Sequence, residues 1–268
     1  VKTYTDKAPQ IYEQISEETD ADILLCYASD AISLFDEQID SYVKNNSLVP
    51  RPFGKKNLAA FAITQTVFLY NGFYFNMNEN PFDGEKSISK MKASNLLATL
   101  DPYLSSENYA CLFYLLNTTP ISMLSEISIT FSNAEQACES VAEGYYSAIV
   151  IPENIAISFK SSHPSSQISM IVPQNPSYII ETGTILKICK NKDNAERFIA
   201  FLQNLGTQSF LSQELKYHPV RKDMKLSDED KNIIANALTG GLSDTESQLK
   251  NKTEFLQQWL KKTTGSEK

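Results

Sequence analysis

Residues 182–223 constrain the fold of this chain more than any other stretch. The β-branched residues from Thr184 to Cys189 predict a strand, and a polar turn follows at 190–194. Apolar residues then recur at helical spacing, and Gly206 stands where a C-capping glycine is expected. The predicted apolar face consists of Ala195, Phe198, Ile199, Phe201, Leu202 and Leu205. The stretch therefore predicts strand, turn and helix, with a second short helix before Tyr217.

Short apolar strands and amphipathic helices alternate along the rest of the chain. Strands are predicted at 22–26, 66–71, 96–100, 127–131, 146–151 and 168–173. Helices are predicted at 12–15, 32–39, after 101–107, at 134–143 and in the charged tail 228–268. Ser132 and Asn133 are N-cap candidates for one helix, and Gly144 ends it. This alternation predicts an α/β architecture with mostly parallel sheets.

Turn-rich segments divide the chain into two lobes. Residues 76–85 are rich in Asn, Pro, Asp and Gly, which favours a crossing between lobes, and 168–173 bring the chain back. We therefore expect lobe 1 to contain residues 1–75 plus 174–268, and lobe 2 to contain residues 76–173. In the tail, Phe255, Trp259 and Leu260 are predicted to be packing residues.

Composition limits the classes of function. A chain of 268 residues with 42% hydrophobic content can bury a sizeable core, as one large domain or two lobes. Its net charge of −8 argues against nucleic acid, whose phosphates require basic surface. No apolar run approaches the roughly 20 residues that span a membrane. The chain shows neither an initiating methionine nor a signal peptide, which is expected of a processed protein.

The cysteines and histidines are expected to have structural roles rather than catalytic or metal-binding ones. Cys26, Cys111, Cys138 and Cys189 form no Cys-x-x-Cys pair, so buried free thiols are expected, with disulfides left open. His163 lies in a Ser/Pro loop, and packing is expected for His218. Because no Ser-His-Asp order, Cys-His order or glycine-rich phosphate loop stands out, we expect no enzyme.

The order of residue types in 182–223 resembles the C-terminal part of type II periplasmic solute-binding proteins of ABC importers. The resemblance is nearest the ferric-iron-binding branch: a strand leads to Lys190-Asn191-Lys192, a glutamine precedes Phe210-Leu211, and the segment closes with 218–223. Residues 20–25, 66–71 and 132–151 resemble further elements of the same family. The resemblance implies a two-lobed α/β fold of the periplasmic-binding-protein type, with a ligand cleft at a two-crossing hinge.

The N-terminus departs from that family, because few residues precede Asp22. Either residues 1–4 form the family's first strand, and Thr5 and Asp6 then face the cleft, or the chain begins at the second strand. In the second case Thr5 and Asp6 are surface residues. Both alternatives stay open.

The resemblance also implies where a ligand binds. Family members hold it with groups at strand ends and helix N-termini, where unpaired N–H groups carry roughly half a positive charge. The corresponding ligand-binding candidates are Thr5, Asp6, Tyr27, Ser29, Ser105, Ser106, Glu153, Asn154 and Tyr178. For the three serines, helix capping is an alternative role that is compatible with ligand binding.

The metal-binding residues of the iron branch are only weakly represented. That branch places adjacent tyrosines after the strand that here ends at Ile151, but this chain has Pro152-Glu153-Asn154 there. Tyr27 and Glu153 are the remaining candidate metal ligands, since hard oxygen donors suit ferric iron. Iron(III), another metal, an oxyanion and a phosphorylated small molecule all stay open as ligands.

The resemblance implies the substrate-binding component of a bacterial ABC importer. Such a protein is a monomer that meets a transporter permease, and it is periplasmic or extracellular, in some cases as a lipoprotein anchored to the membrane. The alternative is a ligand-sensing or protein-docking module on the same fold that is not coupled to transport.

Overall fold

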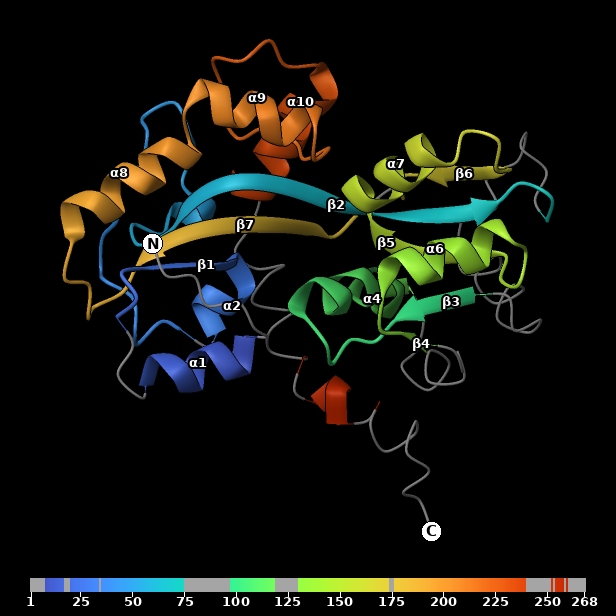
Figure 1. The fold of residues 1–268 in the computed structure, drawn as a ribbon, viewed down its shortest axis with the longest axis horizontal. Coiled ribbons are helices and arrows are strands. Elements are labelled where there is room, and N and C mark those ends of the chain that lie inside the picture. The colour runs from blue at the N-terminus through green and yellow to red at the C-terminus, as the bar shows by residue number, and fades with distance from the viewer. Residues whose placement is uncertain are drawn as a thin grey trace. The chain divides into compact units, whose positions relative to one another are not determined.

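A computed structural model describes residues 8–16, 20–33, 35–74, 97–118, 130–173, 176–239, 252, 254–257 and 259 (Figure 1). The chain forms two compact units. Unit 1 contains Val1–Thr64 and Ile179–Leu249, and unit 2 contains Gln65–Tyr178 and Lys250–Lys268. The chain therefore passes between the units three times, once more than the sequence predicted. The lobe limits 1–75 plus 174–268 and 76–173 stay a prediction, and the predicted crossing at 76–85 lies outside the described residues.

The sheet of unit 1 is built around antiparallel pairing. Strand β1 (Ile23–Tyr27) pairs with β7 (Tyr178–Ile185), and β7 neighbours the first part of β2 (Ala59–Asn71). The strand predicted at 22–26 is present, but the prediction of mostly parallel sheets is wrong for it. Because β1 has β7 as its neighbour and Leu25 is exposed, it forms a half-buried edge strand instead.

Helices cover both faces of this sheet. Side chains of α1 (Ala8–Ser16) and α2 (Ala28–Ser33) pack with Leu24 and Leu186, whereas α8 (Lys192–Leu202) packs with Ile185. Adjacent strand residues point to opposite faces, so Ile185 and Leu186 enter separate cores. Unit 1 also contains η1 (Pro52–Gly54), α9 (Leu205–Gln213), α10 (Asp228–Ile234) and η2 (Ala235–Thr239).

Two helix boundaries in unit 1 differ from the predictions. The helix predicted at 32–39 is wrong, because α2 begins directly after β1 and the chain then turns to bury Phe35 and Ile39 in the core. Gly206 does not cap α8, which ends at Leu202 with Gln203 in the cap position. Gly206 lies instead in the first turn of α9.

The predicted apolar face of α8 is only partly buried. Ala195 and Ile199 are inside, whereas Phe198, Phe201 and Leu205 are exposed. The strand predicted at 184–189 ends at Ile185, because the chain turns immediately afterwards.

The parallel part of the sheet lies in unit 2. Strand β3 (Leu97–Leu100) pairs in parallel with both β4 (Thr130–Phe131) and β5 (Ala148–Pro152). However, β2 runs antiparallel to β5 and to β6 (Ile168–Ile171). The prediction of mostly parallel sheets is therefore wrong for the described strands. Parallel pairing among them is confined to β3, β4 and β5, which helices connect.

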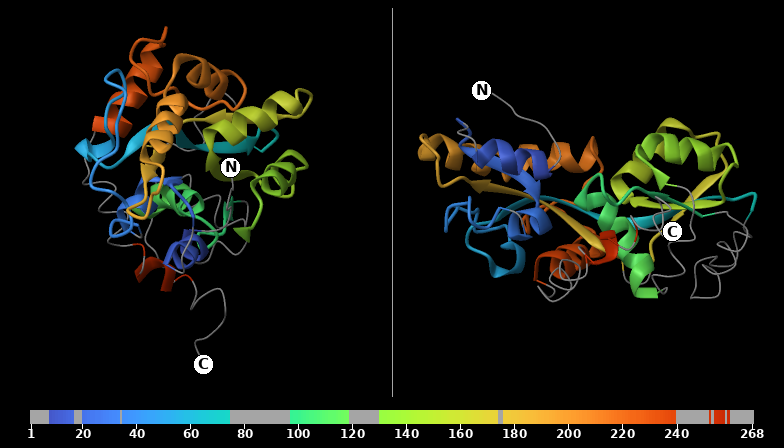
Figure 2. Two further views of the ribbon diagram at one scale, coloured as in Figure 1. Left: turned by 60° about the vertical axis from the view of Figure 1, so that its left-hand side comes forward. Right: turned by 90° about the horizontal axis from the view of Figure 1, so that it is seen from below.

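Helices cover both faces of unit 2 as well. Figure 2 shows α4 (Ser106–Thr118) on one face and α6 (Ala134–Ala142) with α7 (Glu153–Ser162) on the other. The core between the sheet and α6 and α7 includes Leu69, Ile149 and Phe159. Asn133 caps α6 as predicted, accepting hydrogen bonds from the backbone of Glu135 and Gln136.

The C-terminal segment is part of the core of unit 2. Phe255 and Trp259 are buried as predicted, and the Phe255 ring lies 5.9 Å from Tyr109 on α4 and 5.7 Å from Trp259. The Tyr103 hydroxyl donates to the carbonyl oxygen of Leu256. Leu260 lies outside the described residues.

All four cysteines are free thiols, as expected. Cys111 and Cys138 are buried, and burial, together with Glu135 and Glu139, raises the pKa of Cys138 to about 12. Cys26 and Cys189 are half-buried. None of the helices in the described part of the chain is both long and apolar enough to cross a bilayer.

Candidate ligand site at the carboxyl edge of unit 2

Four of the predicted ligand residues lie at one edge of the sheet in unit 2. Because β3 and β5 are parallel, their carboxyl ends meet at the same edge. The segment after β3 leads to Ser105 and Ser106 at the start of α4, and β5 leads directly to Glu153 and Asn154 at the start of α7. In open α/β sheets this edge is where ligands bind.

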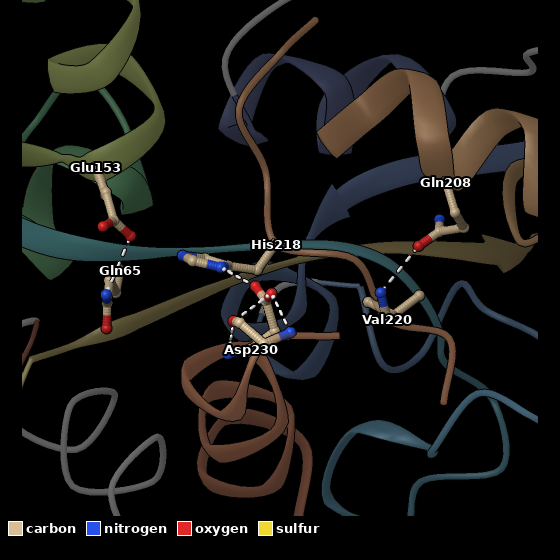
Figure 3. A network of polar contacts seen from close by, with 7 residues as sticks. Gln65, Glu153, Gln208, His218, Val220 and Asp230 are labelled. Carbon is tan, nitrogen blue, oxygen red and sulfur yellow. Dashed lines mark hydrogen bonds and ion pairs between the residues drawn. The ribbon is translucent and has the colours of Figure 1, made fainter. Parts of the chain in front are cut away.

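Glu153 is the most constrained of these residues. It is the first residue of α7, only 4% exposed, and its Oε2 accepts a hydrogen bond from Gln65 Nε2 at 3.0 Å (Figure 3). A carboxylate is favoured at a helix N-terminus, where the helix dipole is positive. Pro152 before it leaves no side-chain cap, so Glu153 and Gln65 form the polar pair at this end of the helix.

Tyr178 reaches the same part of β2 from its other side. Thr66 pairs with Pro152 across the ladder, and its Oγ1 accepts from the backbone N–H of Ser177 at 3.0 Å. The Thr66 N–H donates in turn to the Ser177 carbonyl at 2.9 Å. Residues 65 and 66 of β2 therefore bond to Glu153 on one side and, on the other, to Ser177, the residue before Tyr178.

Ser105 and Ser106 have different partners. Ser105 Oγ accepts from the backbone N–H of Asn108 at 3.0 Å, so the capping role is confirmed for this serine. Ser106 is 8% exposed, and its Oγ accepts from Lys252 Nζ at 2.6 Å. The Lys252 ammonium group also lies 5.5 Å from the centre of the Tyr109 ring. These two contacts hold the ammonium group beside the first turn of α4.

The sequence did not predict Gln65 or Lys252. A signal for Gln65 is visible: Thr64, Gln65 and Thr66 form a polar triplet inside an otherwise apolar strand, and all three are buried. Lys252 is 146 residues from Ser106 in sequence, and nothing in the local pattern marks it.

The candidates outside unit 2 are separate from this edge. Tyr27 ends β1 opposite Glu181, and Ser29 lies in the first turn of α2, where its carbonyl accepts from Ser33 Oγ at 2.8 Å. Both belong to unit 1. The structure therefore places Tyr27 and Glu153, the two predicted metal ligands, in different units. Thr5 and Asp6 lie outside the described residues.

His218 was expected to be a packing residue, but in unit 1 it also forms a polar pair. Its Nδ1 lies 2.8 Å from Asp230 Oδ1 (Figure 3), and its backbone bridges to Ile63 of β2. Asp230 also completes a capping box with Ser227 at the start of α10. Burial alone would raise the pKa of Asp230, but hydrogen bonds from Ser227 and His218 outweigh it and hold the pKa below its ordinary value.

This lowered pKa predicts a pH-dependent contribution to stability. A depressed folded-state pKa stabilises the protein above the unfolded-state value of about 3.9, and the contribution is lost as pH falls through the folded-state value. We expect Asp230→Asn to lower the free energy of unfolding by about 1–2 kcal/mol at pH 6 and by much less at pH 3. Urea denaturation at both pH values measures the difference. Glu229→Gln, an exposed change in the same turn, is the control, and an equal loss at both pH values for Asp230→Asn contradicts the assignment.

The described residues contain no group of three or more His, Cys, Asp or Glu side chains able to hold a metal ion. At the carboxyl edge of unit 2, the Glu153 carboxylate instead accepts from the Gln65 amide, and the Ser106 hydroxyl accepts from the Lys252 ammonium group. Such a set of donors and acceptors suits a small polar ligand, in which hydroxyl groups face Glu153 and an anionic group faces Lys252 and Ser106.

No protein-family model and no curated protein matches the chain. Solved structures with the same fold do match it. Iron-bound HitA from Pseudomonas aeruginosa superposes with a TM-score of 0.70 at 18% identity, covering 91% of this chain and 87% of HitA. The substrate-binding protein of an ABC transporter from Agrobacterium tumefaciens gives 0.70 at 16% identity, covering 93% and 84%.

A third match is described as a two-component system protein that mediates signal transduction. Its TM-score is 0.67 at 15% identity, with 83% of this chain and 78% of that chain covered. The predicted two-lobed α/β fold of type II periplasmic binding proteins is thus confirmed, and the resemblance to the iron-binding branch holds at the level of the fold.

Proposed function

We propose that this chain, which has the fold of type II periplasmic binding proteins, is the extracytoplasmic substrate-binding component of an ABC importer. The observation that carries the proposal is the anchored polar set at the carboxyl edge of unit 2, on a fold that substrate-binding proteins share over most of the chain. In this proposal the two units act as lobes that close on a small ligand and deliver it to a permease. The protein works outside the cytoplasm as a monomer, either free or held at the membrane by a lipid anchor.

The chemistry of unit 2 favours an organic anion or a phosphorylated small molecule as cargo. Bare ferric iron needs several hard anionic oxygen donors, and Glu153 supplies one carboxylate in a position where it is already bonded to Gln65. Lys252 and Ser106 at the N-terminus of α4 would complement a phosphate or carboxylate group. Iron(III) held together with a small anion is the second ligand class, which the iron-bound HitA match supports.

Glu153 is the residue to test. A thermal-shift screen with ferric citrate, inorganic phosphate, sulfate and sugar phosphates identifies a binding class, since ligand at 100 times its Kd stabilises by about 2.7 kcal/mol. For the responding compound, we expect Glu153→Gln to weaken the affinity measured by calorimetry at least about tenfold, or about 1.4 kcal/mol.

Glu139→Gln is the matched control, because Glu139 is an exposed glutamate on a different helix of the same unit. It should leave the affinity unchanged. If Glu153→Gln binds as tightly as the unchanged protein, the site does not lie at this edge.

A ligand-sensing or protein-docking module on the same fold is the second candidate. The match to a two-component signalling protein supports it. Deleting the gene in its native host separates the two functions: a transport component is needed for ligand uptake, whereas a sensor is needed for a transcriptional response while uptake continues.

A further inference from the structure

One loop of unit 1 is basic in a chain that is acidic as a whole. The sequence has 32 Asp and Glu residues against 24 Lys and Arg, yet residues 41–71 contain no Asp or Glu. The basic residues of that stretch are Lys44, Arg51, Lys55 and Lys56. Lys44 and Lys56 are exposed, and Lys55 is half-buried. A local excess of positive charge in a protein of negative net charge favours an anionic partner at this loop.

Arg51 joins the two arms of the loop. Its Nη1 donates to the Lys56 carbonyl at 2.8 Å, and its Nη2 donates to the Val43 carbonyl at 2.9 Å. The Val43 N–H donates to the same Lys56 carbonyl at 3.0 Å. The Arg51 guanidinium also lies 5.3 Å from the centre of the Tyr42 ring. Lys44 and Lys56 therefore lie on neighbouring backbone segments, where their like charges repel.

The tip of the loop is held by residues that are distant in sequence. Gln203 Oε1 accepts from the Asn46 N–H at 2.9 Å, and Gln203 Nε2 donates to Asn45 Oδ1 at 2.7 Å. The Lys222 N–H donates to the Leu48 carbonyl at 3.0 Å. This bond adds another exposed lysine to the loop. The loop is therefore preorganised, which reduces the entropy lost on binding a partner.

The acidic residues next to these lysines in sequence are already paired. Lys192 Nζ lies 2.7 Å from Asp40 Oδ2, and Arg221 Nη2 lies 2.6 Å from Asp223 Oδ2. Within the described part of the chain, four lysines of the loop and its neighbour have no ion pair: Lys44, Lys55, Lys56 and Lys222. Their positive charges are therefore available to a partner.

Two apolar side chains are exposed among these lysines. Tyr42 is 47% exposed and Leu48 is 40% exposed. An exposed leucine gains nothing from a free phosphate or sulfate ion, and it gains little from the phosphates of a nucleic acid. A lipid bilayer matches both kinds of side chain, because charged headgroups cover an apolar interior and tyrosine is enriched at the boundary between them.

We propose that unit 1 docks on the surface of an anionic lipid bilayer through a basic patch. The patch consists of Tyr42, Lys44, Leu48, Lys55, Lys56 and Lys222. Its lysines bind anionic headgroups, and its two apolar side chains enter the interface. Each lysine near such a surface strengthens binding about fivefold, so the four together give a reversible, salt-sensitive attachment.

The patch lies away from the ligand candidates of unit 1. Val43, within the loop, packs with Ile185 at the end of β7, whereas Tyr27 pairs with Glu181 in the middle of that strand. The inference uses no residue of the candidate ligand site, so it does not rest on the proposed function. It holds equally for a transport component and for a sensor.

Vesicle co-sedimentation of the full chain tests the proposal. We expect binding to equimolar phosphatidylglycerol and phosphatidylcholine vesicles, and at least about tenfold weaker binding to phosphatidylcholine alone. Salt at about 1 M should release the protein from the anionic vesicles, because it shortens the screening length to about 3 Å. The patch variant combines Lys44→Gln, Lys55→Gln, Lys56→Gln and Lys222→Gln. It should bind the anionic vesicles at least about tenfold more weakly than the unchanged protein.

A charge-matched control removes four other exposed lysines. It combines Lys160→Gln, Lys187→Gln, Lys190→Gln and Lys231→Gln, so the two variants have the same net charge. The control should bind like the unchanged protein, because charges more than about 8 Å from the membrane are screened at physiological ionic strength. Circular dichroism checks that both variants are folded. An equal loss of binding in the two variants overturns the proposal.

Leu48→Trp reports whether the loop enters the bilayer. The single natural tryptophan, Trp259, is buried in unit 2, so a change in emission comes from the new side chain. We expect the emission to shift to shorter wavelength with anionic vesicles and to be quenched by brominated phospholipid. Tyr145→Trp, at a 70% exposed position of unit 2, should show neither change.

Other occupants of the patch give other results. An emission shift of Leu48→Trp with inorganic phosphate alone identifies a free-anion site. A shift that depends only on protein concentration identifies a second copy of this acidic chain. Either result, or no response to anionic vesicles, overturns membrane docking and leaves the ligand-binding test at Glu153 unaffected.

Discussion

Replacing Gln208 with alanine is expected to lower the free energy of unfolding by about 3–5 kcal/mol. The Gln208 side chain is fully buried on α9, and it makes three hydrogen bonds to backbone groups. Its Nε2 donates to the carbonyls of Phe61 at 2.7 Å and Leu202 at 2.9 Å. Its Oε1 accepts from the Val220 N–H at 2.8 Å, as Figure 3 shows. Each buried backbone group left without a partner costs about 1–3 kcal/mol.

Two variants identify the cause of this loss. Gln208→Met keeps most of the volume but removes the hydrogen bonds, so it should be nearly as unstable as Gln208→Ala in urea denaturation. Gln213→Ala, an exposed change at the end of the same helix, should stay within about 0.5 kcal/mol of the unchanged protein. A Gln208→Met variant of normal stability would contradict the hydrogen-bonding role.

Replacing Phe255 with alanine is expected to destabilise unit 2 by about 3–5 kcal/mol. Phe255 is 1% exposed between Tyr109 of α4 and Trp259, and removing a buried phenylalanine leaves a cavity that its neighbours only partly fill. Trp259 is the single tryptophan of the chain and is 2% exposed, so its fluorescence reports on this packing. The fluorescence transition should move to lower denaturant concentration.

The exposed change Gln257→Ala lies two residues away on the same segment and serves as the control. It should leave the fluorescence midpoint unchanged. If Phe255→Ala behaves like Gln257→Ala, the C-terminal segment does not belong to the core of unit 2.

The scaffold was predictable because its signals are local. Strand, turn and helix patterns in 182–223 depend on neighbouring residues, and the N-cap at Asn133 follows from a short side chain that bonds to its own helix. The resemblance includes a glutamine before Phe210-Leu211, and the structure shows its physical role. Gln208 connects α9 to the Pro219-Val220 segment by accepting a hydrogen bond from the Val220 N–H. Such a motif identifies the fold, because its hydrogen bonds connect elements of the framework.

What could not be predicted depends on contacts between distant segments. The α8 helix ends earlier than its apolar pattern suggested, because the buried Gln203 side chain bonds to Asn45 and Ala60 more than 140 residues away. Lys252 beside Ser106 and Gln65 beside Glu153 arise in the same way. The antiparallel pairing of β2 with β5 was not predicted either, because an apolar strand has the same residue pattern in parallel and antiparallel pairs.

Native mass spectrometry of the full chain, purified without denaturation from its native host, tests the central claim most directly. The account predicts one small polar molecule or ion bound per chain, released on mild unfolding and largely absent from Glu153→Gln purified in the same way. A bare mass for the unchanged protein, together with no thermal shift from ferric citrate, phosphate, sulfate or sugar phosphates, would contradict a ligand-binding function.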